Sequence, residues 1–390
     1  MHEPAPIENP PRPANEARPA LHNPELGPAP ITEPAPKRDQ RPAWLPAYLP
    51  ELQGLRGIAV ILVVLYHNLP LLKDTWIYKP LLWGWSGVNL FFTLSGFLIT
   101  SILIEARDKP HYFRDFYARR ALRIWPMYVL LLVACYAVPD WFLGSSWAEA
   151  TRWKTLLAYA LFVQNLRHTP LPGTLGPTWS LAIEEQYYVV WAPVVRFLRG
   201  RLAWLLPVIL SVLIVTAPVI RASHAKFLNP THTLSHLDGI AMGSLLAISI
   251  YGLRLTRKTW LWIGLAILIF GLGGTNTLFH GPLLDTGLSL GFTGAVILAA
   301  AGTGARNPIA WLLRRGPLPY YGQISYGLYM THILVFVYWG SFNAKLDHMG
   351  TTGHLIIVVL RLIAATLVAT ALWYGFESRI LKLKKYFQTA

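Results

Sequence analysis

The chain is poor in cysteine and in charged residues. It has one cysteine among 390 residues, which excludes an intramolecular disulfide and a paired-cysteine metal site. That residue, Cys135, falls in an apolar run and is expected to be a packing residue. Only 14% of the residues are charged and 54% are hydrophobic, in runs longer than a soluble core needs. The composition therefore predicts an all-α integral membrane protein.

The N-terminal segment lacks any apolar stretch. Residues 1–50 hold almost half of the 30 prolines, together with scattered charges, and show no hydrophobic region of a signal peptide. Such a segment cannot bury enough apolar surface to fold. We expect a disordered Pro-rich cytoplasmic tail, whose polyproline-prone composition would also suit a protein partner.

Acidic residues are scarce beside basic ones. The chain has 19 Asp and Glu against 34 Lys and Arg, a formal charge of +15. Most of the basic residues lie in short segments between apolar runs, where they set membrane topology and do not indicate a nucleic-acid partner.

The long apolar runs predict about ten transmembrane helices, since each crossing needs about 20 residues. Basic residues gather in every second loop, so the positive-inside rule places both termini in the cytoplasm. The membrane domain then covers 51–378 and a short basic cytoplasmic tail covers 379–390. The expected spans are 55–72, 86–105, 122–139, 178–198, 203–220, 234–251, 259–275, 283–302, 322–341 and 354–375.

The segment 153–166 allows a competing model with eleven spans. It is short, and counting it as a crossing would move a later basic cluster outside. We expect instead an interfacial or re-entrant segment in an external loop, 140–177, whose Trp141, Trp147 and Trp153 suit the headgroup region.

Ionisable side chains inside apolar spans are costly, so they are candidates for a site. Arg56 precedes His67 by eleven residues, which places both on one helical face about 16 Å apart. A histidine can accept a proton from a hydroxyl near neutral pH, and an arginine can hold a phosphate. The alternative for His67 is a hydrogen bond between helices that serves packing.

A second polar face runs along the span 178–198. Ser180, Glu184 and Tyr188 repeat at intervals of four residues and therefore face one way. A buried carboxylate such as that of Glu184 can orient a histidine or stabilise its charged form. A structural pairing of Glu184 with an arginine is the alternative.

Two further spans carry polar residues at helical spacing. Ser325, Tyr329 and His332 share a face of the span 322–341, for either a direct role or interhelical hydrogen bonding. In the span 86–105, Asn89 and Gly96 indicate close helix packing.

A basic cluster stands at the start of the span 122–139. Arg119, Arg120 and Arg123 suit the phosphates of coenzyme A, although topological anchoring would also explain them. His236 and Asp238 are expected either to help bind a substrate or to satisfy each other.

Together these segments resemble the acyltransferase-3 family of bacterial membrane enzymes, which move acyl groups, usually acetyl from acetyl-CoA, onto carbohydrates. The resemblance covers nearly the whole membrane region. Its motifs, in family order, are Arg56 with His67, Phe91-Phe92-Thr93-Leu94-Ser95-Gly96-Phe97, Arg120-Ala-Leu-Arg123-Ile-Trp-Pro126, Trp179-Ser180-Leu-Ala-Ile-Glu184-Glu185-Gln-Tyr-Tyr188 and Ile324-Ser325-Tyr326-Gly-Leu-Tyr329-Met-Thr-His332.

The resemblance implies that His67 is the essential catalytic residue, with Arg56 as its companion and Arg120 and Arg123 on the donor side. Glu184 matches a glutamate typical of the family. The chain is expected to be the stand-alone form, without the esterase-like domain that some relatives append. The Pro-rich tail departs from the family pattern.

We therefore expect an enzyme of the bacterial inner membrane that uses acyl-CoA as donor, a carbohydrate or glycoconjugate as acceptor, and neither a permanent cofactor nor a metal. His67 would act as base or as covalent acyl carrier. The competing functions are a transporter or flippase of lipid-linked sugars and a scaffold that recruits a synthase through 1–50. The residues expected to hold the thioester or the acceptor are Ser325, Tyr329, His332, Ser180, Tyr188, Asn89 and Ser95.

Overall fold

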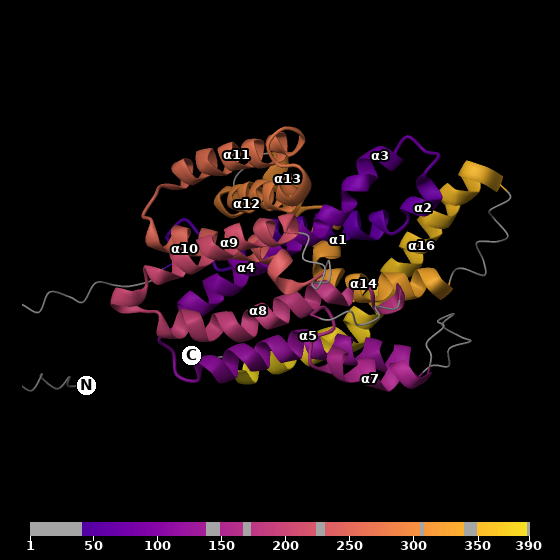
Figure 1. The fold of residues 1–390 in the computed structure, drawn as a ribbon, viewed down its shortest axis with the longest axis horizontal. Coiled ribbons are helices and arrows are strands. Elements are labelled where there is room, and N and C mark those ends of the chain that lie inside the picture. The colour runs from indigo at the N-terminus through magenta and orange to yellow at the C-terminus, as the bar shows by residue number, and fades with distance from the viewer. Residues whose placement is uncertain are drawn as a thin grey trace, which may run out of the picture. The chain divides into compact units, whose positions relative to one another are not determined.

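The computed structural model describes residues 41–137, 149–166, 173–223, 231–304, 308–338 and 349–387. Every regular element in these ranges is a helix (Figure 1). The expected disordered tail lies almost wholly outside the described residues, as do Trp141, Trp147 and the side chain of Trp153.

A helix lies at each of the ten segments predicted to span the membrane. These helices are α1 (Pro50–Tyr66), α4 (Gly87–Ala106), α5 (Tyr112–Ala137), α8 (Thr178–Phe197), α9 (Leu205–Ala222), α10 (Leu237–Gly252), α11 (Arg257–Gly273), α12 (Leu284–Gly302), α14 (Pro317–Tyr338) and α16 (Gly350–Leu372). Shorter helices are α2 (Leu69–Leu72), α3 (Tyr78–Leu81), α7 (Glu149–Ala160), α13 (Pro308–Arg314) and α17 (Ser378–Leu381).

Five helical segments among the described residues are long and apolar enough to cross a membrane. Three of them contain α9, α11 and α16 and leave most of their length at least partly exposed, as helices in contact with lipid do. The other two contain α4 and α12 and are mostly buried inside the helical assembly. An all-helical membrane protein is thus confirmed. The five segments are Tyr78–Ala106, Gly200–Ala222, Arg257–Asn276, Gly281–Gly302 and Gly350–Phe387.

Glycine brings α1 and α14 into backbone contact. A Cβ atom on Gly57 would lie 2.1 Å from the Leu318 carbonyl oxygen, and one on Gly322 would lie 1.9 Å from that of Gln53. Only glycine permits this approach, which is a common device in membrane helix packing. Farther along, α1 meets α14 again where His67 contacts His332. The contacts along α1 and α14 therefore follow the same order in both helices, so the two helices are parallel.

The helices α4 and α10 form a second parallel pair in the same way. Gly239 lies against Asn89 and Phe92, and one turn later Gly243 lies against Thr93 and Phe97. A Cβ atom on Gly96 would lie 2.0 Å from the Ile240 carbonyl oxygen. The packing interpretation of the polar and small residues in α4 agrees with these contacts.

The structure moves two predicted boundaries. Helix α1 ends at Tyr66, so His67 caps its C-terminal end and is not buried within a span that continues to residue 72. Helix α5 begins at Tyr112, ten residues before the predicted start of its span at 122, and continues through Pro126. A proline removes one backbone hydrogen bond but does not always end a membrane helix.

Candidate active site

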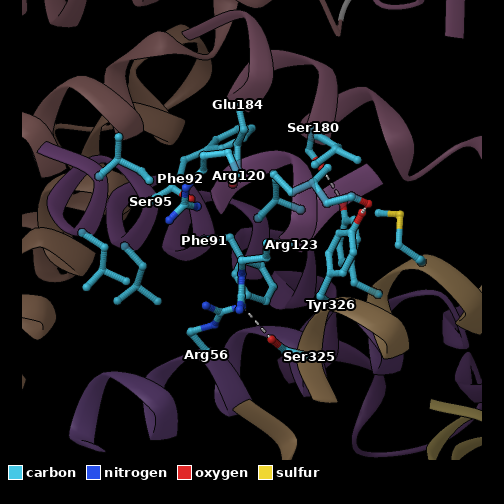
Figure 2. Close-up of a pocket in the computed structure, with 18 of the residues that line it drawn as sticks. Arg56, Phe91, Phe92, Ser95, Arg120, Arg123, Ser180, Glu184, Ser325 and Tyr326 are labelled. Carbon is cyan, nitrogen blue, oxygen red and sulfur yellow. Dashed lines mark hydrogen bonds between the residues drawn. The ribbon is translucent and has the colours of Figure 1, made fainter. Parts of the chain in front are cut away.

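A cavity of about 250 Å³, here called the arginine cavity, lies among α1, α4, α5, α8 and α14. Four cationic side chains line it, and Glu184 is the carboxylate among its lining residues. Figure 2 shows three of the cations, with Glu184 and Ser95, around this space. The cations are Arg56, Arg120, Arg123 and Lys384.

No salt bridge to a residue that the structure describes is found for these four cations. Arg56 donates through Nη2 to Ser325 Oγ at 3.1 Å, whereas its buried Nε has no partner there. The Arg120 guanidinium lies over the Tyr188 ring, 5.6 Å from its centre. No hydrogen bond or salt bridge to a described residue is found for Arg120, Arg123 or Lys384. The cavity therefore suits a ligand with several negative charges.

The predicted polar face of α8 is confirmed and meets this cavity. Ser180 and Glu184 line it. The Tyr188 hydroxyl donates to Glu184 Oε2 at 2.8 Å and lies 2.9 Å from the Ser95 hydroxyl. These bonds hold the carboxylate beside the arginines.

A second cavity of about 240 Å³, here called the histidine cavity, contains His67. Val88 and Tyr329 line both cavities, so the two spaces meet at these side chains. The Tyr329 hydroxyl lies 2.7 Å from Ser180 Oγ and donates to the Pro177 carbonyl at 3.1 Å. The other polar and aromatic residues that line the histidine cavity are Tyr66, Trp85, Asn89, Trp179, His236 and Asp285.

The ring of His67 contacts a second histidine. His332 is fully buried, and its Nε2 lies 3.3 Å from His67 Nδ1. His332 Nδ1 lies 2.8 Å from the Tyr329 carbonyl oxygen, and His67 Nδ1 lies 2.8 Å from that of Val63. Because a carbonyl only accepts, both Nδ1 atoms carry the proton in the neutral pair. His332 Nε2 is then an acceptor for His67 Nδ1–H, and His67 Nε2 is unprotonated.

The predicted contact between Glu184 and His67 does not occur among the described residues. Glu184 lies in the arginine cavity, and the groups that contact His67 Nδ1 are the Val63 carbonyl and His332. Helical periodicity gave the correct face of α8 but could not give the helix that this face meets. Arg119 is also misplaced by the sequence prediction: its Nε donates to the Asp115 carbonyl at 3.0 Å, and it does not line the arginine cavity.

An arginine that the sequence reasoning did not single out fixes the far side of the histidine cavity. Arg221 pairs with Asp238 at 2.8 Å, and Thr286 donates to the same carboxylate at 2.7 Å. Arg221 Nε also lies 3.8 Å from Asp285 Oδ2. These interactions of Arg221 connect α9, α10 and α12 and hold Asp285 at the cavity.

His236 lines the histidine cavity, so its expected part in substrate binding stays a prediction. His236 Nδ1 lies 4.0 Å from Asp285 Oδ2, and its ring is 4.9 Å from that of Trp179. The Asp238 carboxylate forms its salt bridge with Arg221.

A polar side chain of α16 was also missed. Arg361 donates through Nη1 to Asn68 Oδ1 at 3.2 Å, next to His67 in sequence. It lies within a predicted span, so the cost of an intramembrane charge was a signal that could have identified it. Among the described residues, no group of three or more His, Cys, Asp or Glu side chains could hold a metal ion.

The fold and the site define a helical membrane protein with a cationic cavity and a histidine-bearing cavity that share a wall. Residues 49–376 match the family described as an acyltransferase domain, and the chain belongs to this acyltransferase-3 family, as its motifs indicated.

Two relatives illustrate the family. The chain is 28% identical over 318 residues to the peptidoglycan O-acetyltransferase OatA of Listeria monocytogenes, covering 73% of this chain and 49% of the relative. It is 26% identical over 330 residues to the O-acetyltransferase OatA of Staphylococcus aureus, covering 77% and 53%. The chain thus spans about half the length of the curated relatives it matches. No solved structure matches it.

Proposed function

We propose that this protein is a multi-pass O-acyltransferase of the bacterial cytoplasmic membrane. It transfers an acyl group, most simply acetyl, from acyl-CoA to a hydroxyl of a carbohydrate or glycoconjugate. The observation that carries the proposal is a pair of cavities that meet at Tyr329 and Val88. One is lined by cations, and the other is lined by His67 and aromatic side chains. The names of the relatives, O-acetyltransferases and in one case a peptidoglycan O-acetyltransferase, support the reaction class and a glycan acceptor.

The helix directions support an even number of crossings, as in the predicted ten, and the positive-inside rule places both termini in the cytoplasm. In that topology α1 and α14 are the first and ninth spans, and α4 and α10 are the second and sixth, so each pair is parallel. If α7 were an additional crossing, each pair would be antiparallel. Helix α7 has 12 residues, about 18 Å, too short for a hydrocarbon core of about 30 Å.

The arginine cavity is the proposed donor site and opens toward the cytoplasm. Its arginines lie at the proposed cytoplasmic ends of α1 and α5, and a guanidinium group can bind a phosphate through two parallel hydrogen bonds. An apolar wall that includes Phe91, Leu98 and Ile102 continues from them and suits the pantetheine arm. The thioester would then lie at Tyr329, where the second cavity begins.

The histidine cavity is the proposed acceptor site. Trp85 and Trp179 offer aromatic faces to a sugar ring, while Asn89 and Asp285 offer hydrogen-bonding groups to its hydroxyls. This site lies at the end of α1 opposite to Arg56, and therefore on the outer side of the membrane in the proposed topology.

The reaction follows from the protonation of the histidine pair. His67 Nε2 removes the proton from the acceptor hydroxyl, whose oxygen attacks the thioester carbonyl carbon. The Ser180 hydroxyl, or the Tyr329 hydroxyl after it gives up its bond to the Pro177 carbonyl, donates a hydrogen bond to the developing oxyanion. The carbon–sulfur bond breaks, the proton passes from His67 to the thiolate, and the products are the ester and free coenzyme A.

The test is acetyl transfer by the purified full-length protein in nanodiscs, from radiolabelled acetyl-CoA to peptidoglycan fragments and other surface glycans. His67→Ala should lower the transfer rate by roughly 10²- to 10⁴-fold and leave CoA binding unchanged. His280→Ala is the matched control, because His280 is exposed and lines neither cavity. A wild-type protein that neither transfers nor hydrolyses acetyl-CoA would indicate a transporter, and normal transfer by His67→Ala would remove the proposed base.

A further inference from the structure

The chain folds onto the membrane helices beyond α16 and does not leave them as a separate tail. It continues through a π-helical turn (Trp373–Glu377), α17 and a 3₁₀ segment (Lys382–Phe387). The last two elements pack against α5, the helix that carries Arg120 and Arg123. In Figure 1 this yellow C-terminal segment lies alongside α5.

One lysine of this segment enters the arginine cavity. Lys384 is half-buried and lines the cavity, whereas the neighbouring lysines Lys382 and Lys385 are exposed and do not line it. The Lys385 ammonium instead lies over the Tyr386 ring, 4.9 Å from its centre. The positive-inside rule explains basic residues here but does not require one of them to be directed into a cavity.

The charge around Lys384 is unfavourable without a ligand. Its ammonium is repelled by Arg56, Arg119, Arg120 and Arg123 and makes no hydrogen bond or salt bridge to a residue that the structure describes. Placing like charges together away from water is costly unless anions compensate them.

The carboxylates at hand do not balance this cluster. Glu184 is bonded to Tyr188, and the buried Glu377 acts on Arg123 from the C-terminal turn. Three carboxylates, those of Glu184, Glu185 and Glu377, act on the four cations of the cavity, and Lys384 has no hydrogen bond or salt bridge to any of them. The cations still outnumber these carboxylates, and an anionic ligand would compensate the remaining positive charge.

We propose that Lys384 binds a phosphate group of the acyl-CoA donor, so that the C-terminal segment completes the donor site opposite the arginines of α1 and α5. This inference rests on the proposed donor. Coenzyme A carries a pyrophosphate and a 3′-phosphate, more phosphate groups than one arginine fork can hold, and a lysine contributes a point charge to such a site.

The test measures binding of coenzyme A and of pantetheine, which lacks the phosphates, to full-length protein in nanodiscs. Lys384→Gln should weaken coenzyme A binding about tenfold and leave pantetheine binding unchanged. Lys384→Arg should restore most of the affinity. Lys385→Gln, which removes the same charge one residue away, should bind coenzyme A like the wild type.

Three results would overturn the inference: wild-type coenzyme A affinity in Lys384→Gln, equal weakening in Lys384→Gln and Lys385→Gln, or equal loss of pantetheine binding. Equal weakening would indicate bulk charge, and pantetheine loss would indicate a disturbed fold. A wild-type protein that does not bind coenzyme A would instead refute the proposed donor. The two failures are therefore distinguishable.

Discussion

The arginine cavity and the histidine cavity have nearly the same volume but opposite chemistry. The first gathers cations that form no salt bridge to a described residue, and the second gathers aromatic rings with histidine and aspartate. Yet α1 supplies Arg56 to the first and His67 to the second, and α14 supplies the residue that contacts each of them, Ser325 and His332. One pair of parallel helices thus sets the distance between the two sites.

The largest effect should come from separating this helix pair. Gly322→Ala would place a Cβ atom 1.9 Å from the Gln53 carbonyl oxygen, so α1 and α14 must move apart. Overpacking of this kind costs about 1–3 kcal/mol of stability. A shift of about 1 Å between catalytic groups can cost about 100-fold in rate. We expect both losses, measured by thermal unfolding and by acetyl transfer.

The control for this change is Gly252→Ala. No atom lies within 4 Å of a Cβ atom built on Gly252, so stability and transfer should stay at the wild-type level. Wild-type transfer in Gly322→Ala would show that the two cavities do not depend on the α1–α14 contact.

A smaller loss should follow from changing the orientation of His67 alone. His332→Phe fills the buried site but removes one of the two acceptors for His67 Nδ1–H and leaves only the Val63 carbonyl. We expect transfer to fall roughly 30-fold with coenzyme A affinity unchanged. His332→Gln keeps an acceptor oxygen and should recover part of the rate. Equal rates for the two variants would contradict a positioning role, and steady-state kinetics with binding measurements decides between them.

The smallest effect should be confined to the acceptor side. Asp285→Asn removes a charge from the wall of the histidine cavity and should raise the KM for the glycan about tenfold, with the KM for acetyl-CoA unchanged. Asp108→Asn, at an exposed carboxylate paired with Arg199, should change neither constant. A rise in the KM for acetyl-CoA would show that the two cavities are not separate binding sites.

The sequence allowed the prediction of the helical membrane fold and of several polar residues that line each cavity. Apolar runs and polar spacing are local properties, so they identified α8 with Ser180 and Glu184 and also identified His67 and His332. Which helix faces which neighbour is a tertiary property. For that reason Glu184 was predicted to contact His67, and the contact between His332 and His67 was not predicted.

Lys384 and Arg221 could not be assigned by the same reasoning. Both stand at the ends of apolar segments, where the positive-inside rule or interfacial anchoring already accounts for a basic residue. Only the packing of the C-terminal segment on α5, and of α9 beside α10 and α12, directs these side chains inward. Arg361 differs, because its position within a span made it recognisable.

Tyr329 and Val88 form the wall between the two cavities, and this arrangement bears on the order of substrate binding and product release. In the proposed assignment the two substrates enter from opposite faces, so neither blocks the other's entrance and either can bind first. Coenzyme A can leave while the glycan product is still bound, because the products also depart on opposite sides. The acyl group is then the only part of the donor that changes compartment, and the thioester bond supplies the free energy for its passage without an ion gradient.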